Sequence, residues 1–196
     1  MFEYFVKGGP IMWPLLMCSL VSLTIIIERI IFFRSIKVNH DLIQKVLELI
    51  SVKEFDKALK ILEKVYVPFK DIFDEAIKNF NSPGLEPILK DTAEQQIPKL
   101  EKYLTILSSI ASVSTLLGFL GTVTGMIKAF ESIAAAGAAS PQIVSKGIAE
   151  ALTTTAAGLF IAIPTIIFYN YFNYKVEKFV HSMEHYIQEI LDIKGK

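Results

Sequence analysis

The sequence is short of several residue types that mark common protein classes. Its single cysteine, Cys18, cannot form a disulfide within the chain. Its 20 Lys and Arg residues balance its 20 Asp and Glu residues, so no overall positive field favours nucleic acid. It also lacks the G-x-x-x-x-G-K-[ST] loop that holds nucleotide phosphates. These absences exclude an internally disulfide-bonded fold and a nucleotide site of that kind.

Charge is missing from three long stretches, residues 11–27, 103–127 and 151–174. A transmembrane helix needs about 20 consecutive apolar residues, so each stretch is long enough to cross a bilayer. No small-x-small cleavage site follows the first stretch, so we expect it to be retained rather than removed as a signal peptide. We therefore predict an all-α integral membrane protein with three transmembrane helices, at 11–33, 103–127 and 147–174.

Lysine and arginine indicate the orientation of these helices. They gather at and just after the end of the first span, before the second and after the third, at Arg29, Arg34, Lys37, Lys99, Lys102, Lys175 and Lys178. The positive-inside rule places those ends in the cytoplasm. The rule then predicts two periplasmic segments. One is the N-terminal segment 1–10, and the other is 128–146, which consists of a loop and the start of the third helix.

The two remaining segments are predicted to be cytoplasmic and helical. Charges return at helical spacing in 34–102, which Pro68 and a turn at residues 81–84 divide into roughly three helices. Segment 175–196 continues the third span as a C-terminal helix. We expect the 34–102 region to pack on extensions of the membrane helices or between subunits, because it is small for an independent core.

Several polar side chains stand inside or at the mouth of the spans. They are Ser112, Thr115, Thr122, Glu150, Thr154 and Thr155. A carboxylate such as Glu150 costs several kcal/mol in lipid unless it is paired, hydrated or protonated. If desolvated, it could bind and release a proton near neutral pH, which indicates a wall of an ion path. For Glu150 the alternatives are an interface residue that snorkels outward or one that pairs with Lys146 one turn back. For the hydroxyls the alternative is a bond to their own helix carbonyls.

Small residues and one proline accompany the hydroxyls. Gly121 and Gly125 form a G-x-x-x-G pair, and Gly118 and Gly158 are similarly small, so another helix can approach closely. Pro164 removes a backbone hydrogen bond in mid-span and is expected to produce a fixed bend.

The C-terminal segment contains the pattern H-x-x-E-H, at His181, Glu184 and His185. One group of metallopeptidases uses this pattern. A working zinc site needs a third protein ligand, which the neighbouring residues cannot supply from a separate helix. We interpret the match as a coincidence on an amphipathic helix, and we expect no metal, no cofactor and no enzymatic activity.

Two motifs carry a resemblance to a known family. The sequence GFLGTVTGM at 118–126, with Phe130, precedes GIAEALTTTAAGL at 147–159, with AIP at 162–164. In order and spacing these resemble the MotA/TolQ/ExbB proton channel family, and most closely ExbB and TolQ. By motif position, Thr122, Glu150 and Thr155 match the polar lumen residues of the family.

The resemblance implies a homo-oligomeric ring in the bacterial inner membrane. The ring would be a pentamer around two copies of an ExbD- or TolR-like single-span protein. Proton flow would drive that inner pair, and the work would pass to a TonB- or TolA-like protein, for outer-membrane transport or for Tol-Pal envelope function. The other hypothesis is a passive membrane scaffold that gathers a single-span partner without lining the proton path.

Overall fold

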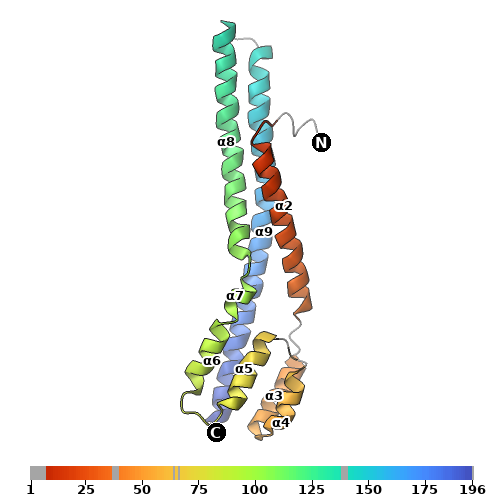
Figure 1. Cartoon of the computed structure of the whole chain (residues 1–196), viewed down its shortest axis with the longest axis vertical. Coiled ribbons are helices and arrows are strands. Elements are labelled where there is room, and N and C mark those ends of the chain that lie inside the picture. Colours follow the sequence, from red (N-terminus) through yellow and green to blue (C-terminus); the bar gives the residue numbers. More distant parts are fainter. Residues whose placement is uncertain (1–7, 37–39, 64, 66, 138–140, 196) are drawn as a thin grey trace. The chain divides into compact units, whose positions relative to one another are not determined.

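The computed structural model of the chain describes residues 8–36, 40–63, 65, 67–137 and 141–195. The described residues form helices and no strands. Residues 1–7 of the predicted periplasmic segment 1–10 lie outside them. Figure 1 labels the helices from α2, which is Met12–Ser35, to α9, which is Pro141–Lys194. Within these described ranges, three helices, α2, α8 (Leu104–Ala136) and α9, are long and apolar enough to cross a membrane.

The chain divides into two compact units, and α2 and α9 contribute to both. One unit, here called the span unit, holds the residues up to Arg29 together with Tyr103–Tyr171. The other, here called the helical unit, holds Ile30–Lys102 and the chain from Phe172 onward.

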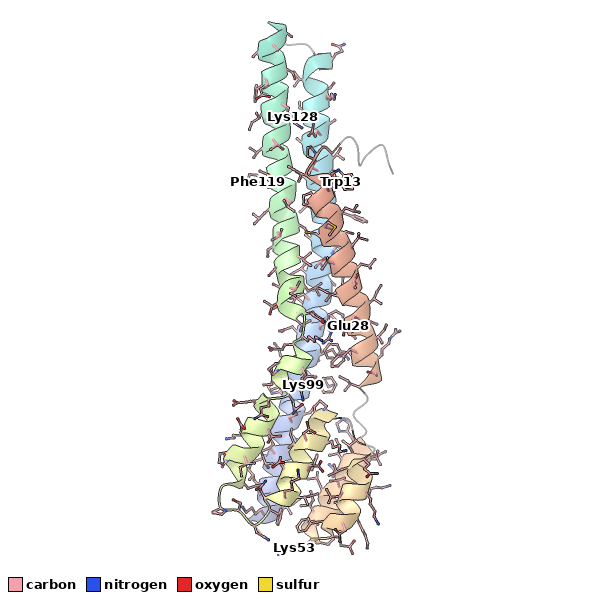
Figure 2. All side chains as sticks on the ribbon, viewed as in Figure 1. Trp13, Glu28, Lys53, Lys99, Phe119 and Lys128 are labelled. Atoms are coloured by element: carbon pink, nitrogen blue, oxygen red, sulfur yellow. The ribbon has the colours of Figure 1, made fainter. Side chains whose placement is uncertain are left out.

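The span unit consists of the first part of α2, all of α8 and the first part of α9. Helix α8 buries a series of residues at steps of three or four, the spacing that keeps one helix face turned to a partner. These are Leu104, Leu107, Ala111, Ser114, Gly118, Gly121, Gly125 and Ala129. Large side chains such as Trp13 of α2 and Phe119 of α8, each 66% exposed, project away from the unit (Figure 2). This outward apolar surface suits contact with lipid or with other membrane helices.

Helix α8 continues past the predicted end of its span at residue 127. It includes Lys128 and the alanine-rich residues after it, and it ends at Gly137, which adopts φ +66°. Alanine is the best helix former, and glycine in the left-handed region is a common helix end, so the extension follows from local preference. Most of 128–146 is thus helical, with α9 beginning at Pro141. The membrane boundaries themselves stay predictions.

Helix α9 runs unbroken through Pro164, which lies at an exposed position. The one helix contains both the predicted third span and nearly all of the predicted C-terminal segment.

Between α2 and α8, the described part of the helical unit contains five helices, where the sequence predicts roughly three. They are α3 (His40–Ser51), α4 (Phe55–Leu62), α5 (Val67–Lys78), α6 (Leu85–Glu94) and α7 (Ile97–Leu100). The break between α3 and α4 falls at Lys53, which adopts φ +59°, while Glu54 donates its backbone N–H to Leu49 O at 2.9 Å. No glycine or proline marks this turn, so residue pattern alone does not reveal it.

The core of the helical unit forms against the last part of α9. Phe33 stacks on Phe172, with ring centroids 5.7 Å apart, and Phe69 meets the ring of Tyr186 edge-on at 5.7 Å. The His40 ring nitrogen Nδ1 lies 2.6 Å from the Tyr186 hydroxyl, and Lys194 Nζ donates to Ser82 O. The expectation that this region packs on the extension of a membrane helix is therefore confirmed.

Candidate functional site

The site is built on a seam of small residues where α8 and α9 meet. A Cβ added at Gly158 would lie 2.6 Å from Ser114 O, and one added at Gly125 would lie 2.8 Å from Gly147 O. Residue numbers rise along one helix as they fall along the other, so the two helices run antiparallel. Backbones this close leave no room for side chains, which explains glycine at these positions. The helix that packs closely against the Gly121–Gly125 pair is thus α9 of the same chain.

Thr122 and Thr155 join the two helices through their hydroxyls, which lie 3.0 Å apart. The Thr155 hydroxyl also donates to Gly118 O at 2.8 Å, and the Thr122 hydroxyl oxygen lies 2.9 Å from Phe119 O. Because Gly118 has no Cβ, its carbonyl can approach the Thr155 side chain from the opposite helix. The two threonines form a continuous set of hydroxyl and carbonyl oxygens across the seam, and both are half-buried.

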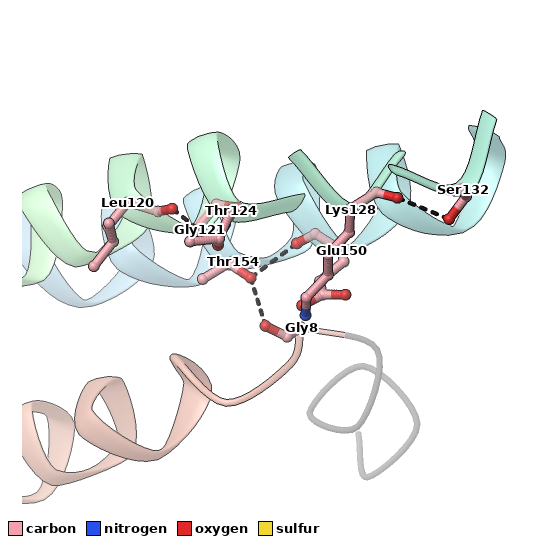
Figure 3. Close-up of polar contacts among 8 residues, drawn as sticks. All are labelled: Gly8, Leu120, Gly121, Thr124, Lys128, Ser132, Glu150 and Thr154. Atoms are coloured by element: carbon pink, nitrogen blue, oxygen red, sulfur yellow. Dashed lines mark hydrogen bonds and ion pairs between the residues drawn. The ribbon is translucent and has the colours of Figure 1, made fainter. Parts of the chain in front are cut away.

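Thr154 points to a different neighbour, although it adjoins Thr155. It is fully buried, it fills the space that Gly121 leaves on α8, and its hydroxyl donates to Gly8 O at 2.7 Å. The same hydroxyl lies 2.8 Å from Glu150 O one turn earlier (Figure 3). Thr154 therefore joins α9 to the turn before α2, and it takes no part in the contact between Thr122 and Thr155.

Glu150 forms an ion pair with Lys128 of α8, and its side chain is only 15% exposed. The sequence offered Lys146 as the partner, because it lies one turn earlier on the same helix. That alternative is wrong in the structure, where Lys146 is exposed and the short contact runs from Lys128 Nζ to Glu150 Oε1. The cation lies on the other helix, a proximity that spacing along α9 cannot reveal.

Ser112 and Thr115 lie away from this seam. Both are exposed, and each donates to the carbonyl one turn back, at Ser108 O and Ala111 O. For these two residues the structure shows the local bond that the sequence left as the alternative.

Besides Thr122, α8 turns the hydroxyl-bearing residue Ser114 to the seam, and Ser114 was not among the residues predicted from the sequence. It is fully buried, and its oxygen has no hydrogen-bond partner among the described residues. Its seven-residue spacing from Gly121, on the same face as Gly118, is the signal that identifies it.

Arg29 is a second residue whose role the sequence did not indicate. The sequence used it only to mark the cytoplasmic end of the first span, and in the structure it is 1% exposed. Its Nη2 donates to Glu28 Oε1 at 2.6 Å, and its guanidinium lies 5.7 Å from the ring centroid of Tyr103. A buried charge needs partners of this kind to be stable. Through its contact with Tyr103, Arg29 links α2 to the residue just before α8.

The histidines of the H-x-x-E-H pattern lie on the exposed face of α9. His181 contacts Glu184 at 3.3 Å, and His185 contacts Glu189 at 3.5 Å. Among the described residues, no three His, Cys, Asp or Glu side chains group together as a metal site would require.

Comparison with known proteins agrees with the two motifs. Residues 55–185 match the model of the MotA/TolQ/ExbB proton channel family. The chain is 33% identical over 170 residues to the putative ExbB-like 3 biopolymer transport protein of Synechocystis, covering 84% of this chain and 81% of that one.

Two further relatives carry the names ExbB and TolQ. Biopolymer transport protein exbB1 of Vibrio cholerae is 30% identical over 166 residues, covering 81% of this chain and 72% of that one. The Tol-Pal system protein TolQ of Haemophilus influenzae is 36% identical over 134 residues, covering 65% of this chain and 58% of that one.

Proposed function

Because the chain belongs to the MotA/TolQ/ExbB proton channel family, we propose that it is the ring-forming subunit of a proton-driven motor in a bacterial inner membrane. It is an ExbB/TolQ-like, multi-pass membrane protein. The finer assignment is a homo-oligomer, expected to be a pentamer, that surrounds an ExbD- or TolR-like single-span protein. The motor would drive a TonB- or TolA-like protein, for outer-membrane transport or for envelope function.

The observation that carries this proposal is the polar contact between two apolar helices. Thr122 and Thr155 contact each other at 3.0 Å, and Glu150 lies on the same helix as Thr155. Hydroxyls and a carboxylate are costly in hydrocarbon, so their place between long apolar helices indicates a polar path in the assembled protein. We infer that Thr122, Glu150 and Thr155 line this path, with Thr154, Thr115 and Ser112 as further polar groups beside it. The inferred packing residues are Gly118, Gly121, Gly125, Gly158 and Pro164.

The driving force is adequate for such a motor. One charge that crosses the membrane releases about 2.3 kcal/mol per 100 mV. Since about 1.4 kcal/mol corresponds to a factor of ten, each proton can bias a two-state element more than tenfold. The proposed topology places the N-terminus in the periplasm and the C-terminus in the cytoplasm.

The test uses purified complexes and proton flux together. The chain is co-expressed with a single-span partner, and native mass spectrometry counts the subunits. Proton flux is then followed with a pH-sensitive dye in vesicles. Glu150→Ala and Thr155→Val should each keep the assembly and lower the flux at least tenfold.

Thr24→Val is the matched control, because it also removes a hydroxyl from an apolar helix but loses only a bond to its own helix. It should retain flux close to that of the unmodified protein. Undiminished flux in both Glu150→Ala and Thr155→Val would reject the proton path and leave the passive scaffold. In a scaffold, bulky substitutions at Gly121 or Gly125 would matter while hydroxyl removal would not.

A further inference from the structure

Three separate parts of the chain meet around the Glu150 carboxylate. Glu150 extends from α9, Lys128 reaches it from α8, and the turn before α2 lies against the Glu150 side chain (Figure 3). All three belong to the span unit. Glu150 is therefore held by contacts from two other segments.

The turn at Gly8 and Gly9 is shaped by this contact. Gly9 adopts φ +72°, and a Cβ added there would collide with the carboxylate of Glu150. Gly8 O accepts the hydroxyl proton of Thr154 at 2.7 Å, and Gly9 O accepts the backbone N–H of Met12 at 3.1 Å. The same turn thus contacts the carboxylate and begins helix α2, and glycine is needed for both its conformation and its closeness.

We propose that Lys128 is a positioning residue for Glu150, and that the Gly8–Gly9 turn completes a clasp around the carboxylate. Lys128 Nζ fixes one oxygen of Glu150, while the turn prevents the side chain from swinging toward α2. The proposal rests on the proposed function in taking Glu150 to line the proton path. The inference goes beyond the proposed function in two ways. It assigns Lys128 as the fixed counter-charge of Glu150, and it gives the turn before α2 a part in the site.

The chain supplies a matched control for the lysine. Lys146 carries the same charge, lies one turn before Glu150 on α9 and is exposed. If general positive charge near Glu150 were sufficient, Lys146→Met and Lys128→Met would have equal effects. If the contact in the structure matters, only Lys128→Met should disturb Glu150.

The first test detects the contact without measuring activity. A water-soluble carbodiimide condenses a touching amine and carboxylate into an amide, and the carbodiimide takes up the water that is lost. Applied to the full chain in detergent, it should link Lys128 to Glu150, as found by proteolysis and mass spectrometry. The link should persist in Lys146→Met. A link from Lys146 in place of Lys128 would overturn the proposal.

The second test decides the matter even if neither link forms. The unfolding midpoint is measured for Lys128→Met, Glu150→Gln and the double variant, and for the same cycle with Lys146→Met. The proposal expects the Lys128 and Glu150 effects to be non-additive and the Lys146 and Glu150 effects to add. Additive effects in the Lys128 cycle would overturn it.

The glycine turn has its own control in Gly137, which adopts φ +66° but has open space where an added Cβ would lie. Alanine at Gly137 therefore meets only the backbone strain, whereas alanine at Gly9 meets that strain and the carboxylate. Gly9→Ala should lower the midpoint more than Gly137→Ala, and Glu150→Ala should remove the excess. Equal effects of the two glycine substitutions would rule out the clasp.

Proton flux separates this inference from the proposed function. Lys128→Met should lower the flux about tenfold, because a displaced group loses its working geometry, and Lys128→Arg should restore most of it. Lys146→Met should leave the flux unchanged. If Glu150→Ala and Thr155→Val both keep full flux while the Lys128–Glu150 link forms, the proposed function fails and the clasp stands. If Glu150→Ala abolishes flux and Lys128→Met does not change it, the positioning role fails.

Discussion

Three consecutive threonines on α9 illustrate how much a single helical step changes a residue's role. Each step turns the side chain by about 100°, since a turn contains 3.6 residues. Thr153 is half-buried, Thr154 is fully buried against α8 and the turn before α2, and Thr155 contacts Thr122. Identical side chains thus have different partners, and a substitution at one should not reproduce a substitution at the next.

Tyr186 offers a residue-scale prediction in the helical unit, beyond the predicted third span. Burial, and secondly the charge of Glu189, raise the pKa of its phenol above the ordinary value of 10.0. The folded state then holds this proton more tightly than the unfolded state. The resulting stability is complete below about pH 10 and is lost as the pH rises through the raised pKa.

Tyr186→Phe removes both this pH dependence and the contact with His40. We expect a loss of about 1 kcal/mol at neutral pH, as for one buried hydrogen bond, and a smaller fall in stability above about pH 10. Thermal unfolding of the detergent-solubilised chain between about pH 7 and 11 measures both effects. Tyr174→Phe, at a 63% exposed position, is the control and should change neither. An unchanged alkaline fall in Tyr186→Phe would contradict the assignment.

The close approach of α8 and α9 is decided at the level of the helix pair. Glycine at four seam positions, Gly118, Gly125, Gly147 and Gly158, brings backbone against backbone. In lipid no hydrophobic force drives helices together, so this close packing has to hold them. The cost of glycine's flexibility within a helix is offset by the contact it allows.

Gly158→Leu tests this packing. Its side chain would have to enter the space where even a Cβ lies 2.6 Å from Ser114 O, so the helices must separate. We expect a loss of about 1–3 kcal/mol or more in unfolding free energy. Ala156→Leu places the same side chain two residues earlier at an exposed position and should change it by less than about 0.5 kcal/mol. Equal losses would show that the seam does not determine the stability of the pair.

At the scale of the whole molecule, charge balance gives no orientation but charge placement does. The net charge is zero, whereas lysine and arginine gather at the predicted cytoplasmic ends of the spans. Positively charged loops are retained in the cytoplasm during insertion, so the distribution predicts the topology.

Cysteine labelling tests that topology in a Cys18→Ala background. Ala135→Cys lies on the exposed end of α8, and Lys90→Cys lies on the exposed face of α6. A membrane-impermeant maleimide added to intact spheroplasts should label position 135 at once. Position 90 should react only after the membrane is permeabilised. The reverse pattern would invert the proposed orientation.

Much of the architecture follows directly from the order of residues. Three uncharged runs predicted three long helices, since apolar length and helix period are local properties, and all three are present. Gly121 and Gly125 indicated a close helix contact, because the spacing of two small residues along one helix is also a local property. The break at Lys53 was missed because a left-handed lysine leaves no mark in residue pattern.

What the sequence determined by itself is the class of the protein, its three apolar helices and the motifs that assign its family. Only the tertiary structure decided which polar groups meet: Glu150 with Lys128 rather than Lys146, Thr154 with Gly8, and Thr122 with Thr155. The physical reason is range. Helix formation depends on neighbours within about one turn, whereas each of these contacts joins helices or turns far apart along the chain and exists only once their backbones have packed.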